Sequence, residues 1–556
     1  MKLNHSLSLP HLPKEVLKGA RKTKLCAYAV ALEGWRRGLK LTWYSKDSDK
    51  FDHMITFGTN PPGRLFSLSS DERTHYFFRT RGDKVTKEAV EIGSDKDETK
   101  LWLLKAGVST PEGKKFEGHV TDDEIVQYSA SLDFPLVLKP TNGSMGNGVI
   151  TDIENEEELR KALHYVRVEL GYDSVILERF ATGEEYRVYV IEDQVIAAYN
   201  RKPANVTGDG VHTIEELVEL KNKLRKKNAR LYDCLIEISQ ETIDFIGKKG
   251  YTLQSIPKEG EVILLQEKTN VSAGGDPVDA TDKLPQEIKQ LAIDAVKAIP
   301  GLHHGGVDII WDQNKPIDKA AVVIEINPTA QIGGALFPVK GKSRDIPAAI
   351  IDYYFPETKG IKTDKEKIYF DFKSVLEPLQ NRTAIEVEVP RAPIGKIYTK
   401  RYLFTLRSVK KANYQKKLKK RALAKNLHGH VNLLSNSKME LVVAGTDKKA
   451  IADFKKQLMK DVEAGKIAKV QEKSWKKPVK VGFEISEDIT VTSLQSAETK
   501  VKNLEKEIRN LEKQKNRLEF ENIKLQQSNS WRYTAIIRKL GRWLKGKNQV
   551  LAKHSN

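Results

Sequence analysis

The chain has 556 residues, 39% of them hydrophobic, and a formal net charge of +19. Its length suits three or four domains, and its two cysteines, Cys26 and Cys234, argue against a disulfide framework and favour a reducing cytoplasm. No apolar run approaches the length of a membrane span, and we expect no secretion signal in residues 1–14.

Residues 1–90 predict a small α/β domain, with a helix over 20–38, strands over 39–44 and 53–57, and a further helix over 70–79. This region carries no motif of its own. Arg79, Arg81 and Lys84 form a basic cluster, for which we favour a solvated surface over a binding role.

A glycine-containing loop follows the apolar run 134–138. The run ends in Lys139-Pro140, and Gly143, Gly146 and Gly148 come next. Glycines let backbone N–H groups approach phosphate oxygens, and a lysine at a strand end adds positive charge. No Gly-Lys-Ser/Thr follows, which excludes a Walker A loop. Taken alone, the pattern fits a hairpin with a surface lysine equally well.

Acidic residues interrupt several apolar strands farther along the chain. Glu178 lies in the run 175–180, Asp308 in 306–310, and Glu325 with Asn327 in 322–328. A carboxylate in such a strand is costly unless a cation pairs with it. Because alternate strand residues share a face, Asp308, Glu325 and Asn327 offer three oxygen ligands on one side of a sheet, a set that suits Mg²⁺.

Residues 92–338 resemble the ATP-grasp ligases, and most closely the ATP-grasp modules of cyanophycin synthetases and bifunctional bacterial glutathione synthetases. The likeness covers a little under half of the chain. The matching segments, in order, are 95–100, 106–113, 137–140, 201–204, 206–213, 270–275, Asp308 and 325–328.

The resemblance implies specific roles. Lys96 and Lys139 would reach the ATP phosphates, with Lys100 as a weaker candidate, and residues 142–148 would form a phosphate lid that includes Gly143, Ser144, Gly146 and Gly148. Residues 178–181, among them Glu178, Arg179 and Ala181, would hold adenine, and Glu185 the ribose. Arg187 and Arg201 would face phosphate or an acyl phosphate, although a surface position is the alternative for Arg187. Asp308, Glu325 and Asn327 would hold Mg²⁺, with Mn²⁺ as the alternative metal.

The reaction implied by this resemblance is ATP-dependent ligation of a carboxylate to an amine, or to a thiol, through an acyl phosphate. Its substrates would be small-molecule or peptide carboxylates and amines. Residues 328–338 depart from the family pattern, which leaves amino acids, short peptides and sugar acids open as substrates. For His303 and His304 a surface turn is favoured over an acid–base role.

Residues 356–393 are interpreted as a linker, and 394–487 predict a ferredoxin-like βαββαβ order. This second region resembles the acylphosphatase family through 427–432 and 445–454. Gln415 stands at the position of that family's catalytic arginine, the phosphate-loop glycines are absent from 410–415, and Asn432 matches the catalytic asparagine to within one residue. We expect an inactive domain that binds an acyl phosphate or polyanion, or only packs.

The C-terminal region has two further patterns. A three-and-four spacing of apolar residues over 490–528 favours a parallel two-stranded coiled coil and a homodimer, with a single packed helix as the alternative. Residues 529–556 form a basic amphipathic segment typical of a membrane-surface or partner contact. The start of that segment resembles a tail of bacterial envelope-polysaccharide glycosyltransferases, which indicates cell-envelope polymer synthesis at the inner face of the membrane.

We therefore predict an α/β (α+β) protein. It would comprise a Rossmann-like domain (1–90), as is usual ahead of an ATP-grasp module, the ATP-grasp domain (91–355), the linker, the acylphosphatase-like domain, the coiled coil and the tail. No nucleic-acid partner is expected; an anionic lipid or polymer suits the basic charge better. One alternative is a non-catalytic ATP-binding scaffold, against which Lys139, Asp308, Glu325 and Asn327 argue. The other is an active acylphosphatase, against which Gln415 argues.

Overall fold

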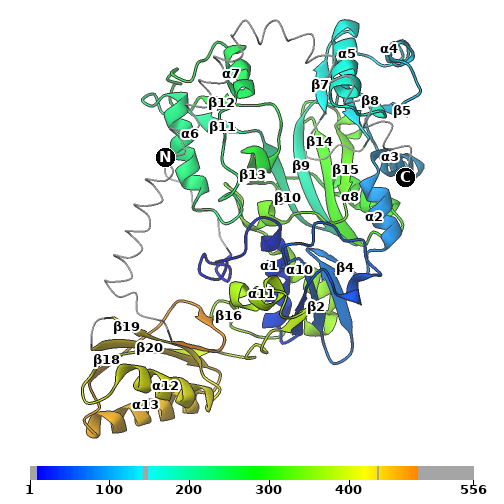
Figure 1. Ribbon diagram of the computed structural model, residues 1–556. Coiled ribbons are helices and arrows are strands. Elements are labelled where there is room, and N and C mark those ends of the chain that lie inside the picture. Colours follow the sequence, from blue (N-terminus) through cyan, green and yellow to red (C-terminus); the bar gives the residue numbers. More distant parts are fainter. Residues whose placement is uncertain (1–8, 142–147, 435–436, 486–556) are drawn as a thin grey trace, which may run out of the picture. The chain divides into compact units, whose positions relative to one another are not determined.

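The computed structural model describes residues 9–141, 148–434 and 437–485 (Figure 1). The predicted coiled coil (490–528), the tail (529–556) and most of the glycine loop lie outside the described residues. None of the helices in the described ranges has both the length and the apolarity needed to cross a bilayer.

The first sheet is antiparallel throughout, with the strand order β17-β1-β2-β3-β4. Its strands are β1 (Lys40–Tyr44), β2 (Leu65–Ser69), β3 (Thr74–Phe78), β4 (Arg81–Gly82) and β17 (Glu386–Glu388). A Rossmann-like domain needs parallel strands joined by crossovers, so that expectation is wrong. The helix expected over 70–79 is also wrong, because a short turn leads into β3, where Phe77 stacks on Phe66.

Residues 356–393, predicted to be a linker, form regular secondary structure. They contain β16 (Ile368–Tyr369), α11 (Phe372–Gln380) and β17, which pairs with β1. Phe370 and Phe372 are buried in one hydrophobic core with residues of α1 (Thr23–Arg36) and α10 (Ile346–Tyr354). The interpretation as a linker is therefore corrected: this segment completes the N-terminal domain, because its aromatic residues bury their area there.

The second sheet has the order β13-β10-β9-β14-β15, and all its pairings are antiparallel (Figure 1). Its strands are β9 (Glu184–Ile191), β10 (Gln194–Lys202), β13 (Asp276–Asp279), β14 (His304–Trp311) and β15 (Ala321–Asn327). The helices α2 (Lys87–Ser94), α3 (Lys96–Lys105) and α8 (Gln286–Ala298) share one apolar core with it. Since that core covers one face, the charged residues of these strands occupy the other.

The third sheet is smaller and has the order β5-β8-β6-β7. Its elements are β5 (Gly113–Phe116), α4 (Asp122–Ser129), β6 (Leu136–Pro140), β7 (Ile150–Ile153), α5 (Glu156–Leu163) and β8 (Val175–Arg179). A two-stranded antiparallel sheet of β11 (Asn205–Thr207) and β12 (Val262–Leu264) packs with α6 (Ile214–Arg225) and α7 (Gln240–Gly247), which lie between the two strands in the chain. A short helix, α9 (Gly333–Leu336), follows β15.

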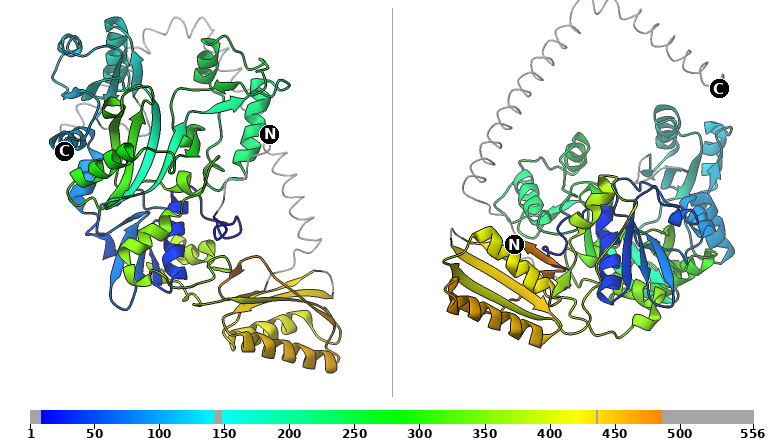
Figure 2. Two further views of the ribbon diagram at one scale, coloured as in Figure 1. Left: turned by 180° about the vertical axis from the view of Figure 1, so that it is seen from behind. Right: turned by 60° about the horizontal axis from the view of Figure 1, so that its bottom comes forward.

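The last described domain has the predicted βαββαβ order. Its elements are β18 (Tyr398–Leu406), α12 (Lys411–Leu423), β19 (His428–Leu433), β20 (Lys438–Gly445), α13 (Lys448–Glu463) and β21 (Ile467–Lys473). The sheet order β21-β18-β20-β19 is ferredoxin-like, and β23 (Phe483–Ile485) adds a parallel strand beside β19. Both helices lie on one face of this sheet (Figure 2). A two-residue strand, β22 (Val479–Lys480), pairs with β16.

Candidate functional site

Strand register in the second sheet gathers the predicted metal ligands. Asp308 on β14 lies opposite Glu325 on β15, and Gly306 lies opposite Asn327. On its other side, Asp308 lies opposite Arg187 of β9. Because residues two apart or directly opposite share a face, Asp308, Glu325, Asn327 and Arg187 form one group, which we call the Asp308 centre.

Two arginines hold the carboxylate of Asp308, which is only 1% exposed. Arg187 donates from Nε to Oδ1 and from Nη2 to Oδ2, each at 2.5 Å, and Arg201 donates from Nη1 to Oδ2 at 2.9 Å. Burial alone would raise the pKa of Asp308, but Arg187 and then Arg201 outweigh it and hold this pKa below its usual value. Arg201 also bonds Glu185 at 2.5 Å, and Glu185 accepts from Thr269.

Glu325 and Asn327 keep polar atoms available. Glu325 keeps a solvent-accessible side chain although many protein atoms surround it, and it forms no ion pair with a described residue. The surrounding protein raises its pKa by displacing water, and the negative charge of Asp308 raises it further against the effect of Arg187. The amide nitrogen of Asn327 is buried without a hydrogen-bond partner among the described residues. The carboxylate oxygens of Asp308 and Glu325 and the side-chain oxygen of Asn327 are the hard oxygen ligands that suit a divalent cation such as Mg²⁺ or Mn²⁺, whereas the unpartnered amide nitrogen is a donor and takes no part in such a site.

A second charge group lies on the third sheet. Glu178 of β8 accepts from Lys100 Nζ at 2.8 Å and pairs with Lys139 Nζ of β6 at 2.5 Å. Its side chain is buried. Burial alone would raise the pKa of Glu178, but Lys139 and Lys100 outweigh it and keep this pKa below its usual value. We call these three residues the lysine centre. Lys100, the weaker sequence candidate, therefore lies beside Lys139.

Lys96, the first residue of α3, connects the two groups electrostatically. Burial lowers the pKa of Lys96, and its ammonium group also interacts with the charges of Glu325, Lys139 and Glu178. Asp95 caps the helix, accepting from the backbone N–H groups of residues 97 and 98. The Asp-Lys pair thus fixes an ammonium group within electrostatic range of both centres.

The other residues predicted to bind ATP are not part of the Asp308 centre or the lysine centre. Arg179 forms ion pairs with Asp133 at 3.0 Å and Glu112 at 3.5 Å, so the structure does not bring its side chain to the lysine centre. Ala181 follows β8 and offers only its backbone as a polar group. Gly148 is buried, and its φ is +71°. A Cβ at this position would lie only 3.1 Å from Pro140 Cγ. Gly143, Ser144 and Gly146 lie outside the described residues.

Three sequence interpretations are corrected by burial. Arg79 and Arg81, expected on a solvated surface, are both buried because the turn after β3 lies inside the N-terminal domain. His304, expected in a surface turn, begins β14 and is buried between the hydroxyl groups of Tyr189 and Tyr354, each 3.0 Å away. These positions carry no periodic signal, since their burial depends on chain segments far apart in the sequence.

Sequence reasoning also missed Thr269 and Arg230. Thr269 donates to Glu185, and Arg230 is buried and donates to Ser272 Oγ at 3.2 Å. Thr269 stands directly before the matched segment 270–275, so its neighbourhood could have indicated it. Arg230 follows a lysine-rich helix without any motif, so no local pattern distinguishes it from the exposed basic residues around it.

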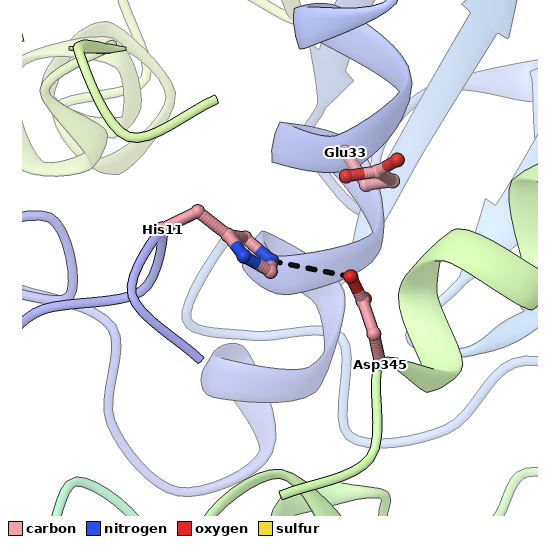
Figure 3. A group of neighbouring side chains, drawn as sticks. All are labelled: His11, Glu33 and Asp345. Carbon is pink, nitrogen blue, oxygen red and sulfur yellow. Dashed lines mark ion pairs between the residues drawn. The ribbon is translucent and has the colours of Figure 1, made fainter. Parts of the chain in front are cut away.

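His11, Glu33 and Asp345 form another polar group, with three ligand-type atoms within 4.8 Å of one another (Figure 3). Glu33, 2% exposed, already pairs with Arg37 Nε at 2.7 Å and with Lys365. Burial alone would raise the pKa of Glu33, but these two cations outweigh it and lower this pKa. Its charge is therefore neutralised without a metal, and the His11–Asp345 contact of 3.3 Å fastens the N-terminal segment to α10.

In the ferredoxin-like domain, Gln415 lies inside the protein. It is part of α12 and only 5% exposed. Asn432 donates from Nδ2 to Glu440 at 3.3 Å, and Glu440 also accepts from Arg401 Nε at 2.5 Å. The two positions that the sequence matched to acylphosphatase catalytic residues are thus occupied by a buried neutral side chain and by an amide bonded within the sheet.

Comparisons with known proteins support both resemblances. Residues 93–227 match the family model of the RimK-like ATP-grasp domain, and residues 408–485 match that of acylphosphatase. A cyanophycin synthetase of Crocosphaera subtropica is 33% identical over 276 residues, covering 48% of this chain and 31% of the relative. The glutathione biosynthesis bifunctional protein GshAB of Clostridium perfringens is 34% identical over 349 residues, covering 61% of this chain and 42% of the relative.

Among solved structures, a bifunctional glutathione synthetase from Pasteurella multocida shares 30% sequence identity. The match covers 53% of this chain and 41% of that one, with a TM-score of 0.43. Because this score is low, the assignment rests on the sequence matches. The chain spans well under half the length of the two curated relatives named above. The chain carries an ATP-grasp domain similar to those of cyanophycin synthetases and bifunctional glutathione synthetases, followed by an acylphosphatase-like domain.

Proposed function

We propose that the protein is an ATP- and Mg²⁺-dependent ligase that joins a carboxylate to an amine through an acyl phosphate. The observation that carries this proposal is the pair of charge groups linked by Lys96. The positive charges of the lysine centre suit the phosphate groups of ATP, and the Asp308 centre combines two arginines with hard oxygen ligands. One curated relative of the ATP-grasp domain is named as a cyanophycin synthetase and another as a glutathione biosynthesis bifunctional protein, which agrees with this class of reaction.

The roles follow from the position of each charge. Lys139, Lys100 and Lys96 would bind ATP phosphate oxygens, while Glu178 holds the first two ammonium groups in place. Glu325, Asn327 and one oxygen of Asp308 would hold Mg²⁺, which when bound neutralises phosphate charge and orients the γ-phosphoryl group. The bonded oxygens of Asp308 retain lone pairs, since each carboxylate oxygen accepts more than one contact.

Arg187 and Arg201 would stabilise the transferring phosphoryl group. A substrate carboxylate oxygen attacks the γ-phosphorus, ADP leaves, and an acyl phosphate forms. An amine then attacks the acyl carbon and releases inorganic phosphate and a proton. No protein nucleophile is required, because positioning and charge neutralisation supply the catalysis. The two guanidinium groups are held by Asp308 at distances that pre-organise them for this task.

The acylphosphatase-like domain is proposed to lack hydrolytic activity. The buried position of Gln415 leaves no arginine to bind a phosphoryl group there. An active hydrolase would also destroy the acyl phosphate that the ligase forms. Dimerisation, membrane contact and a role in envelope-polymer synthesis rest on residues outside the described ranges and stay predictions.

The test is ATP turnover by the full chain with Mg²⁺ against pooled amino acids, short peptides and sugar acids. ADP release is measured with and without hydroxylamine, which traps acyl phosphates as hydroxamates. We expect one pool to drive both signals, and Glu325→Gln to abolish them. Glu88→Gln, which changes an exposed glutamate of α2, is the matched control and should behave like the wild type. ATP binding without turnover in every pool would favour a scaffold.

A further inference from the structure

Three arginines, the buried Arg79 and Arg230 and the partly exposed Arg64, form a cationic group that the proposed reaction does not use. Arg64 directly precedes β2, Arg79 directly follows β3, and Arg230 follows α6. The backbone N–H of Arg79 donates to the Arg64 carbonyl oxygen at 2.8 Å. Burial lowers the pKa of Arg79, and the positive charges of Arg64 and Arg230 lower it further. The guanidinium groups of Arg64 and Arg230 are therefore each within electrostatic range of that of Arg79; we call the three residues the Arg79 cluster.

No carboxylate balances this charge among the described residues. Arg79 is 8% and Arg230 is 9% exposed, and none of the three forms an ion pair with a residue of the described ranges. Arg64 donates to Thr23 Oγ1 at 3.0 Å, and Arg230 donates to Cys234 Sγ at 2.8 Å and to Ser272 Oγ. The guanidinium of Arg79 donates to no described residue, and its Nε is buried without a partner. Burying like charges in this way is costly unless an anion joins them.

The N-terminus of α1 adds further positive potential. Cys26, in the first turns of this 14-residue helix, is close enough to interact with the Arg79 guanidinium. The helix has no acidic residue in its first turn and no capping side chain. Burial lowers the pKa of Lys24, the second residue of this helix, and Arg64 lowers it further. A helix N-terminus favours anions, so the cations gathered there strengthen the same preference.

The backbone of Arg79 is also unusual. Its φ of +60° lies in the left-handed region, which residues with a Cβ rarely adopt. Such conformations persist where the surrounding structure requires a side chain at that place, and they gather at binding sites.

The segment after β15 connects the Arg79 cluster to the Asp308 centre. Thr80 donates from Oγ1 to the Ala330 carbonyl at 2.8 Å. A Cβ on Gly306 would lie 2.7 Å from Ala330 Cβ and 3.1 Å from Arg187 Cδ, and one on Gly333 would lie 2.5 Å from Arg230 Cδ. Residues 330–333 therefore pack against both groups. They belong to the stretch that departs from the family pattern.

We propose that Arg64, Arg79 and Arg230 form a subsite for a substrate carboxylate that is not consumed in the reaction. This inference rests on the proposed ligase function and names its substrate class: an amino acid or peptide whose additional carboxylate is held by guanidinium groups while another of its groups reacts at the Asp308 centre. Guanidinium groups suit this task because they bind carboxylates with paired hydrogen bonds, and the Ser272 and Thr23 hydroxyls can add to them.

The first experiment measures binding without ATP, by calorimetry and thermal shift on the full chain. The probes are L-glutamate, acetate and inorganic phosphate, each compared with chloride at equal ionic strength. We expect both carboxylates to bind and Arg79→Gln to weaken binding about ten- to a hundredfold. Arg79→Lys keeps the charge but loses the paired donors, so its affinity for carboxylates should lie between those of the wild type and Arg79→Gln. Arg73→Gln is the control, because Arg73 is an exposed arginine of the same domain paired with Glu72.

Several results would overturn the proposal. They are equal carboxylate binding by wild type and Arg79→Gln, binding of phosphate alone, or no binding of any probe. In chloride, the Arg79→Gln protein should be at least as stable as the wild type, because removing one guanidinium relieves repulsion. Lower stability with unchanged binding would assign Arg79 a structural role. If Arg79→Gln does not fold, Arg230→Gln carries the same test.

A kinetic experiment separates this proposal from the ligase proposal. In the turnover assay, Arg79→Gln should raise the KM for the carboxylate-bearing substrate about tenfold or more, with a much smaller change in kcat. Turnover by Arg79→Gln with an unchanged KM would contradict the proposed carboxylate subsite and would leave the proposed ligase activity standing. Carboxylate binding that depends on Arg79 in a protein without turnover would keep the subsite and remove the ligase.

Discussion

The ATP-grasp domain and the acylphosphatase-like domain each match a family model, yet they differ in the charged groups that their strands and helices carry. In the ATP-grasp domain, cations and carboxylates from neighbouring strands pair with one another and still leave ligand atoms available, as at Glu325. In the acylphosphatase-like domain, Gln415 is neutral and buried, and Asn432 is bonded to Glu440. A family match therefore gives the fold, while the charges at individual positions decide whether chemistry can follow.

The largest expected effect comes from Asp308→Asn, which tests whether charge pairing defines the active region. The change leaves Arg187 and Arg201 without their shared carboxylate, so we expect a loss of about 3–5 kcal/mol in the free energy of unfolding. ATP turnover should fall at least about a hundredfold. Urea unfolding and ADP release measure the two effects. Full activity in this variant would contradict the roles given to the Asp308 centre.

Glu178→Gln should have the next largest effect. It leaves Lys100 and Lys139 adjacent without a counter-charge and should lower the free energy of unfolding by about 3 kcal/mol. ATP phosphates can replace the lost charge, so Mg·ATP should raise the Tm of the variant more than that of the wild type. An equal ATP-dependent rise in both proteins would show that the lysines do not meet the nucleotide.

The pH dependence of stability tests the burial of His304, the first residue of β14. Burial, and then the charge of His303, lowers the pKa of His304 from 6.5 to about 3. Between these values the unfolded chain binds a proton that the folded chain does not, so stability is full above pH 6.5 and falls as the pH drops towards 3. This group should cost about 2–3 kcal/mol by pH 4.5. His304→Gln should reduce the change of Tm with pH between pH 6.5 and 4.5. If Tm changes with pH as steeply in this variant as in the wild type, His304 is not the cause of the loss of stability.

Asn432→Ala should have the smallest effect. It removes one hydrogen bond to Glu440 and should lower the stability of its domain by about 1 kcal/mol. ATP turnover should change less than twofold, because the residue lies in the domain to which we assign no chemistry. Acyl phosphate hydrolysis by the wild type that disappears in Asn432→Ala would reverse the contrast between the two domains.

Local patterns predicted part of this structure. The ferredoxin-like order and the grouping of Asp308, Glu325 and Asn327 followed from alternation along strands and from the family likeness. The place of β17 in the first sheet could not be predicted this way, because β17 lies more than 300 residues after its partner β1 in the chain. The burial of Arg79 and Arg230 likewise depends on long-range packing, and their sequence surroundings are typical of exposed basic residues.

The most direct measurement of the central claim uses a substrate carboxylate labelled with ¹⁸O, taken from the pool that drives ADP release. In the proposed reaction the carboxylate oxygen attacks the γ-phosphorus and leaves with inorganic phosphate. We therefore expect one ¹⁸O atom in each phosphate released, detected by the isotope shift in the ³¹P spectrum. Phosphate without label, released at the same rate, would show that water attacks ATP and would contradict the acyl phosphate.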